Sequence, residues 1–135
     1  MPATPAARSL SLMSNTFFAV GALLAGLAVA AGAFGAHALQ PRLTPERLNT
    51  YEIAVRYQLY HALGLLALAW GMERWPQAGL QLSAWLFIAG ILIFGGTLYA
   101  LALGAPRWLG AVTPLGGLCL IAGWVLGAWQ LWRLD

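Results

Sequence analysis

Few side chains in this sequence could do chemistry, and several of them lie in apolar stretches. His37 follows a run of mostly small or apolar residues, and Tyr57 precedes His61 by one helical turn. Polar groups at membrane depth are costly and normally face neighbouring helices, where they find a partner. We therefore predict a hydrogen-bonded cluster of His37, Tyr57 and His61.

Other polar residues extend this cluster into a predicted polar pocket. Glu52 and Arg56 are four residues apart and can pair on one helical face, at the rim. The remaining predicted members are Tyr60, Thr97, Tyr99 and Thr113. All of them fall in the half of the helices next to the loop between the first and second helix and the loop between the third and fourth. The pocket is predicted to open on that side.

Two histidines on neighbouring helices could in principle bind haem or a metal ion. No third ligand at a metal-binding spacing accompanies them, and the sequence shows no nucleophile–base pair and no phosphate-binding loop. We therefore predict no catalytic residue, no metal and no cofactor. Two structural interpretations stay open: the tyrosines and tryptophans form belts at the membrane surfaces, and a histidine at a helix end bonds a nearby carbonyl.

The composition is that of a membrane protein. Hydrophobic residues make up 61% of the 135 residues and charged residues 8%, whereas soluble domains carry about 25% charged residues. The net charge of +3 forms no basic stripe with interleaved aromatic residues, which argues against nucleic-acid binding. Three uncharged intervals exceed the roughly 20 residues needed to cross a bilayer. They are Arg8–Arg42, Arg74–Arg107 and Arg107–Arg133.

The pattern predicts an all-α protein, an integral membrane four-helix bundle with up-down-up-down topology. The helices are expected at about 15–39, 45–74, 81–103 and 108–132, in a single transmembrane domain, 1–135. Thr44 and Pro45 are suited to the start of the second helix. Its 30 residues would measure about 45 Å, so we expect it to extend beyond the bilayer. The first run also resembles a secretory signal, but it is long enough to span.

Glycines are expected to bring the helices close together. Gly26 and Gly32 belong to two small-xxx-small patterns of the first helix, which allow close backbone approach in lipid. The pairs Gly95-Gly96 and Gly116-Gly117 lie at similar distances from the loop that joins the last two helices. We predict that these two pairs meet at one depth in an antiparallel contact.

Four motifs carry a resemblance to a known family. They are GAFGAHAL (32–39), YEIAVRYQLYHALGLL (51–66), FGGTLYALAL (94–103) and VTPLGGLCLIAGW (112–124). In this order they resemble the domain of unknown function 423 family, whose eukaryotic relatives are called transmembrane protein 256-like. The resemblance covers about residues 16–132. It implies a four-helix protein of the bacterial inner membrane, with both termini in the cytoplasm, and it implies no established activity.

The sequence therefore predicts a small inner-membrane protein with a polar pocket facing the periplasm. A non-enzymatic accessory or binding protein is the leading interpretation. A small oligomeric transporter or channel is the alternative, and a haem or metal protein that uses both histidines is a third. The expected partners are the lipid bilayer and either further copies of the chain or a partner membrane helix, with no nucleic acid.

Overall fold

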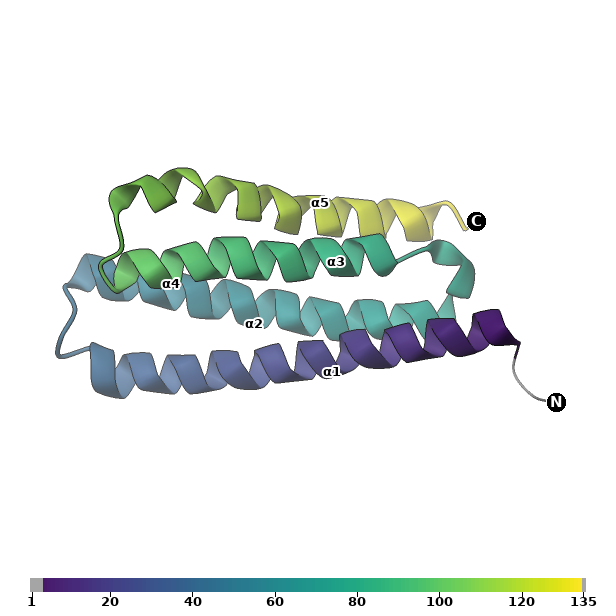
Figure 1. The fold of residues 1–135 in the computed structure, drawn as a ribbon, viewed down its shortest axis with the longest axis horizontal. Helices are drawn as coiled ribbons and strands as arrows, with labels where there is room; N and C mark the ends of the chain where they lie inside the picture. The colour runs from purple at the N-terminus through teal and green to yellow at the C-terminus, as the bar shows by residue number, and fades with distance from the viewer. Residues whose placement is uncertain (1–3, 135) are drawn as a thin grey trace.

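The computed structural model describes residues 4–134, apart from the side chains of Ala6 and Ala7, and contains no strand in that range. Four helical rods follow one another (Figure 1). The first is α1 (Pro5–Phe34) with a π-helical turn, Gly35–Leu39, and the second is α2 (Pro45–Arg74). The third comprises α3 (Gln81–Gly90), a π-helical turn at Ile91–Gly95 and α4 (Gly96–Ala102). The fourth comprises a 3-10 turn, Arg107–Ala111, and α5 (Thr113–Trp132).

Local sequence explains where most of these helices begin and end. The Thr44 hydroxyl accepts a hydrogen bond from the Arg47 backbone N–H (3.4 Å), and Pro45 opens α2, as expected. The second helix ends at Arg74, before Trp75, and the third rod covers the predicted range. The first helix begins at Pro5, ten residues before the predicted start at 15, because no helix-breaking residue follows Pro5.

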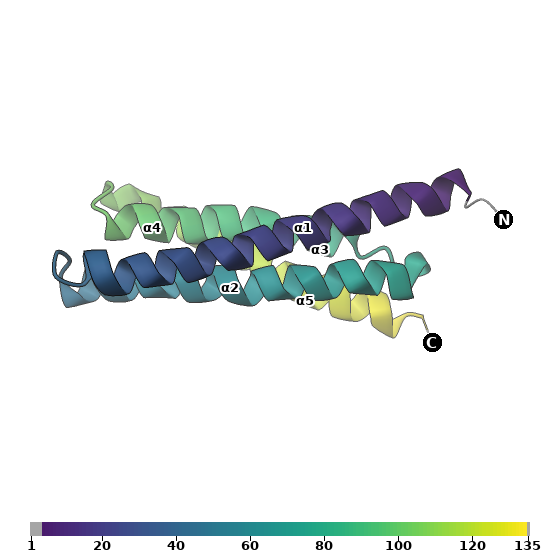
Figure 2. The same ribbon diagram turned by 90° about the horizontal axis from the view of Figure 1, so that it is seen from below.

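The rods are arranged with α1 and α5 on opposite edges (Figures 1 and 2). The long contact of α1 is with α2, and the long contact of α5 is with α3 and the π-helical turn that follows it. Between these edges, α2 packs on α3, α4 and that same turn. The second helix is therefore enclosed by its neighbours more than either edge helix.

Three stretches of the described residues are long and apolar enough to cross a membrane. They are Arg8–Leu39, Gln81–Ala102 and Arg107–Trp132. The second helix is not among them, since it carries Glu52, Arg56, Gln58 and His61. The composition of α2 alone therefore does not show that it crosses a membrane. If it does so, the neighbouring helices must shield its polar side chains from lipid.

The close contact between α1 and α2 follows a seven-residue spacing, at Gly21, Ala28 and Gly35. A methyl group added to Gly21 would lie 3.1 Å from the Ala62 carbonyl oxygen. Gly32 also lies in this contact, but Gly26 is exposed and a methyl group there would meet nothing within 4 Å. Gly26 therefore takes no part in the contact between α1 and α2, because the pattern that contains it faces away from α2.

The last two rods also approach closely, although not through the predicted pairs. A methyl group on Gly116 would lie 2.8 Å from the Phe94 Cα atom, and one on Gly123 would lie 3.2 Å from the Ser83 carbonyl oxygen. One on Gly117 would make only an ordinary contact, 3.6 Å from the Phe94 ring.

Gly95 and Gly96 do not take part in this approach. A methyl group on Gly95 would meet only Tyr99 of its own rod, at 4.0 Å, and one on Gly96 would meet nothing within 4 Å. The helices are therefore neighbours, as predicted, but Gly116 packs on the backbone of Phe94. The predicted contact between the two glycine pairs is wrong, because the face of the third rod that meets α5 runs through Gly90 and Phe94.

Candidate functional site

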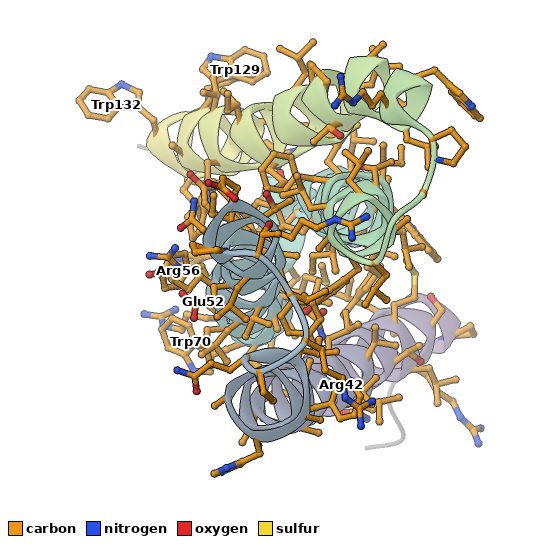
Figure 3. The ribbon with its side chains drawn as sticks, turned by 90° about the vertical axis from the view of Figure 1, so that its left-hand side faces the viewer. Arg42, Glu52, Arg56, Trp70, Trp129 and Trp132 are labelled. Carbon is orange, nitrogen blue, oxygen red and sulfur yellow. The ribbon has the colours of Figure 1, made fainter. Side chains whose placement is uncertain are left out.

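The polar side chains of α2 point in different directions and do not converge on one pocket. Gln58 is buried toward α1 and α4, and His61 is buried toward α3 and α5. Glu52 and Arg56 are exposed (Figure 3). The predicted single pocket is thus divided into three environments, because an α-helix turns about 100° per residue and each position meets a different neighbour.

Gln58 joins three helices. Its Nε2 donates to the Leu24 carbonyl in α1 (2.9 Å), and its Oε1 accepts from the Tyr99 hydroxyl in α4 (3.0 Å). Tyr51, on the same side of α2, donates to the Ala31 carbonyl (2.8 Å) and packs edge-on against the Tyr99 ring, with 5.1 Å between ring centroids. Tyr99 therefore serves an internal network whose members hold one another in place.

Tyr51 and Gln58 were not among the predicted site residues. Tyr51 is 5% exposed, which is incompatible with a place in a belt at the membrane surface. The two residues are seven apart, so they lie on one face of α2, and this spacing is the signal that could have identified them.

His61 lies among aromatic rings. Its Nδ1 is 2.7 Å from the Tyr57 carbonyl oxygen, and since a carbonyl only accepts, Nδ1 carries the proton and Nε2 of the neutral ring is an acceptor. The ring centroids of Phe87 and Trp124 are 5.3 and 6.0 Å from that of the imidazole, and the Tyr57 ring stacks on it at 6.0 Å. The Tyr57 and His61 side chains therefore meet by ring stacking, and the hydrogen bond of His61 goes to the backbone of Tyr57 and not to its hydroxyl.

His37 is exposed in the π-helical turn at the end of the first helix. Gly35, two residues earlier, packs on Tyr51, whereas His61 lies ten residues farther along α2. Ten helical residues rise about 15 Å, which neither a direct hydrogen bond nor a single water can span. The predicted bond between His37 and the other two residues is wrong. The sequence did not show how far the two helices overlap, and α1 packs on α2 from Tyr51 onward.

Thr97 and Thr113 are also brought together, with their hydroxyl oxygens 2.8 Å apart. One hydroxyl donates to the other, and the one that accepts can donate to a carbonyl of its own rod, that of Ile93 for Thr97 (2.7 Å) or that of Leu109 for Thr113 (3.3 Å). These bonds fasten the start of α5 to α4. Tyr60 is exposed on the outside of α2, next to Tyr57.

Glu52 and Arg56 line a hollow between α1 and α2, which we call the charged pocket. It has a volume of about 220 Å³ and is lined by Gly32, Gly35, Ala36, Tyr51, Glu52, Val55 and Arg56. Arg56 Nε donates to the backbone carbonyl of Glu52 (3.3 Å). Within residues 4–134, no hydrogen bond or ion pair engages the Glu52 carboxylate. Both charged groups are therefore available to a molecule in this pocket.

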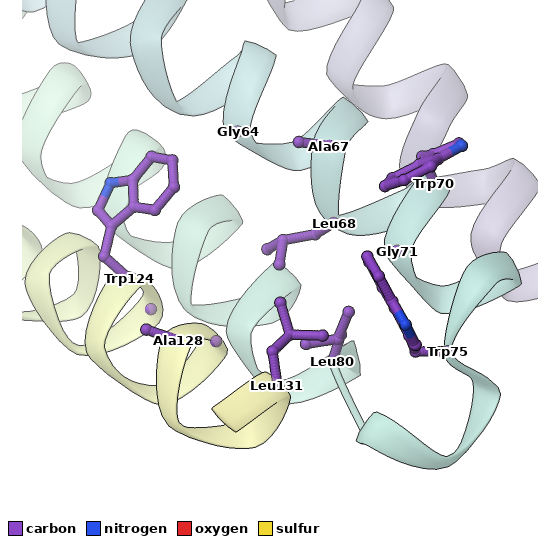
Figure 4. Close-up of a pocket in the computed structure, with 12 residues that line it drawn as sticks. Gly64, Ala67, Leu68, Trp70, Gly71, Trp75, Leu80, Trp124, Ala128 and Leu131 are labelled. Atoms are coloured by element: carbon purple, nitrogen blue, oxygen red, sulfur yellow. The ribbon is translucent and has the colours of Figure 1, made fainter. Parts of the chain in front are cut away.

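A second hollow lies between α2 and α5 and is almost entirely apolar (Figure 4). Its volume is about 320 Å³. The lining residues are Gly64, Ala67, Leu68, Trp70, Gly71, Trp75, Leu80, Gly123, Trp124, Gly127, Ala128 and Leu131. Such a lining suits hydrocarbon, and it supplies no group for acid–base or nucleophilic chemistry.

Polar contacts at the opposite end of the molecule were not predicted. The Ser83 hydroxyl donates to Gln130 Oε1 (3.0 Å), and Gln130 Nε2 donates to the Gly79 carbonyl (2.8 Å). Ser14 donates to a carboxylate oxygen of Glu73. Ser83 and Gln130 lie at similar distances from the loop that joins their helices, so counting from that loop could have paired them.

In the part of the chain that the structure describes, no three His, Cys, Asp or Glu side chains gather into a metal-binding group. The site consists of a closed hydrogen-bond network, a histidine among aromatic rings, and a pocket with two available charges. Only the last of these offers ionised groups to an outside molecule.

Comparison with known proteins identifies the family. Residues 31–117 match the sequence profile described as protein of unknown function (DUF423). The chain belongs to the DUF423 family. The resemblance found in the sequence motifs is thereby confirmed.

The chain is also 42% identical over 110 residues to UPF0382 membrane protein SH2409 of Staphylococcus haemolyticus, covering 82% of this chain and 89% of the relative. It is 41% identical over 113 residues to UPF0382 membrane protein YwdK of Bacillus subtilis, covering 83% and 92%. No solved structure matches the chain. The relatives are named bacterial membrane proteins, and nothing in these names points to enzymatic activity.

Proposed function

We propose that this protein is a non-enzymatic binding protein of the bacterial inner membrane, which holds an amphipathic molecule in the charged pocket. The supporting observation is that Glu52 and Arg56 line one hollow and that their charged groups do not bond each other. Charged groups within membrane-spanning helices normally pair with a partner. A bound molecule with polar and apolar parts would supply that partner.

In this proposal α2 crosses the membrane with its neighbours as part of an up-down-up-down four-helix bundle. Support comes from its position, since α2 packs against α1 on one side and against α3 and α4 on the other. Gln58 and His61 are buried by these neighbours and are shielded from lipid. The start of α2, with Glu46 and Arg47, extends beyond the hydrocarbon layer.

The proposed orientation puts both termini in the cytoplasm and the charged pocket on the periplasmic side. In chains whose native Cys119 is replaced by serine, Asn49→Cys should be labelled by an impermeant thiol reagent added to intact cells. Gln77→Cys should be labelled only after the membrane is opened. If only position 77 were labelled from outside the cell, the orientation would be the opposite of the one proposed.

Filling the charged pocket should remove the bound molecule. Ala36 lines the pocket, and we expect Ala36→Trp to abolish retention of an amphipathic molecule that the wild-type protein carries through purification in mild detergent, because the indole occupies the same volume. Native mass spectrometry measures the retained mass. The matched control is Ala33→Trp, which alters an exposed position of α1 that does not line the pocket. Equal retention by both variants would contradict the proposed function.

One observation favours an oligomeric transporter or channel as the second candidate. Ala22, Gly26 and Ala30 form a small-xxx-small row that is exposed on the edge helix α1. Such rows allow close helix contacts in lipid, and this one faces no other helix of the same chain. The same mass spectra discriminate the candidates, since a single chain in each particle would oppose the oligomer.

A further inference from the structure

We infer that the charged pocket recognises the headgroup of a zwitterionic phospholipid of the ethanolamine type. This inference rests on the proposed function and names the ligand of the same pocket. An ethanolamine headgroup joins a phosphate, which is negative, to a primary ammonium group, which is positive, through a two-carbon link. The pocket holds one cationic and one anionic side chain, Arg56 and Glu52. Its charges therefore match both ends of the headgroup, and its net charge of zero matches the neutral lipid.

Arg56 is positioned to bind the phosphate. A guanidinium carries five N–H donors, and the bond from Nε to the Glu52 backbone carbonyl uses one of them. Among residues 4–134, the two terminal nitrogens of Arg56 have no further partner. Those nitrogens form the fork that binds phosphate oxygens in pairs.

Glu52 is positioned to bind the ammonium group. It lies one helical turn before Arg56, so their Cβ atoms are about 6 Å apart. Its carboxylate has no hydrogen bond or ion pair within residues 4–134. The small residues Gly32, Gly35 and Ala36 on the facing wall leave room for the link between the two charges.

The surface that continues from the pocket identifies the source of the headgroup as a membrane lipid. From Arg56, an exposed apolar row follows the same helix through Tyr60, Leu63, Ala67 and Trp70. Figure 3 shows Glu52, Arg56 and Trp70 on one side of the molecule. The row rises about 21 Å along α2, which exceeds the roughly 15 Å of hydrocarbon in one leaflet. An acyl chain can therefore lie on this row while the headgroup occupies the pocket.

The pocket discriminates against other headgroups on physical grounds. A quaternary ammonium has no N–H to donate to Glu52 and is recognised instead by several aromatic faces. The pocket offers only Tyr51, whose hydroxyl bonds the Ala31 carbonyl. An anionic headgroup has no cation for Glu52 and would be repelled by it.

The test compares three lipids with identical acyl chains and ethanolamine, choline or glycerol headgroups. Each is added in equal amount to the delipidated protein in mild detergent, and native mass spectrometry measures the bound fraction. We expect the wild-type protein to retain the ethanolamine lipid about tenfold more than either other lipid, as a charge-assisted hydrogen bond implies. Arg56→Gln should lower the retention of all three. Glu52→Gln should remove the preference for ethanolamine and favour the glycerol lipid.

Glu46→Gln and Arg42→Gln are the matched controls, because both residues are exposed and lie outside the pocket. These two variants should retain each lipid as well as the wild-type protein does. Equal retention of all three lipids by the wild type, lost in Arg56→Gln, would overturn the ethanolamine assignment and leave the proposed function standing. If neither Arg56→Gln nor Ala36→Trp changed the lipid retention, both the ethanolamine assignment and the proposed function would be overturned. Full displacement of the lipid by an equal concentration of soluble glycerophosphoethanolamine would overturn the assignment to a membrane lipid.

Discussion

The Gly116→Ala variant should lose about 3 kcal/mol of stability, the largest effect we expect from adding one methyl group to a helix contact. The added carbon would lie 2.8 Å from both the Cα and the Cβ atom of Phe94. Backbone atoms cannot rotate away as the end of a flexible side chain can, so α5 must move away from the third rod. That movement would also separate Gly123 from the Ser83 carbonyl and weaken the contact along its length.

Reversible unfolding of the purified protein in mixed micelles, followed by circular dichroism, would measure this loss. The matched control is Gly96→Ala, which introduces the same methyl group into a neighbouring rod. Nothing lies within 4 Å of that position, so the control should be neutral or gain up to about 1 kcal/mol from the higher helix propensity of alanine. Equal midpoints for the two variants would show that α5 and the third rod do not approach as described.

The second large effect is expected at Gln58. Replacing it by leucine keeps the volume similar but removes the acceptor of the Tyr99 hydroxyl and the donor to the Leu24 carbonyl. We expect the free energy of unfolding to fall by about 1.5 kcal/mol, because a half-buried hydroxyl is left without a partner. The same unfolding measurement applies. Gln40→Leu, at an exposed position, should change stability little.

A double-mutant cycle isolates the bond between the two side chains. Adding Tyr99→Phe to Gln58→Leu removes the unpaired hydroxyl, so the double variant should be no less stable than Gln58→Leu alone. Strictly additive losses would mean that the Tyr99 hydroxyl and Gln58 do not interact, and would contradict the network that joins α1, α2 and α4.

The positions of the helices could be predicted largely from the sequence, whereas their contact faces could not. Charged residues and the segments around Pro41 and Pro76 interrupt the apolar runs, and these interruptions locate the second and third helices. The start of the first helix was missed because residues 5–14 are less apolar but still helical. Membrane-like helices are apolar on every side, so hydrophobic periodicity gives little information about which side faces a neighbour.

The same limitation explains which site residues were missed. Gly21 and Gly26 have equal small size, and only the observed contact distinguishes the one that meets α2. His37 and His61 both lie in predicted membrane helices, yet their depths differ because α1 packs on nearly the full length of α2. Glu52 and Arg56 were predicted to pair because opposite charges at i and i+4 are a local signal that needs no knowledge of the packing. That pairing is not seen, since Arg56 bonds the backbone carbonyl of Glu52 and the two charged groups do not bond each other.

The π-helical turn at Ile91–Gly95 has a consequence for how the third rod meets its neighbours. A π turn accommodates one residue more than an α turn, and one residue corresponds to a rotation of about 100°. The turn therefore rotates the second half of the rod by about 100° relative to the first half. Before the turn, Phe87 and Gly90 of this rod pack against α5. After the turn, Tyr99 bonds Gln58 of α2 and Thr97 bonds Thr113 of α5. Without the extra residue, the second half would be rotated by about 100° from its present position, and Tyr99 and Thr97 would point away from Gln58 and Thr113.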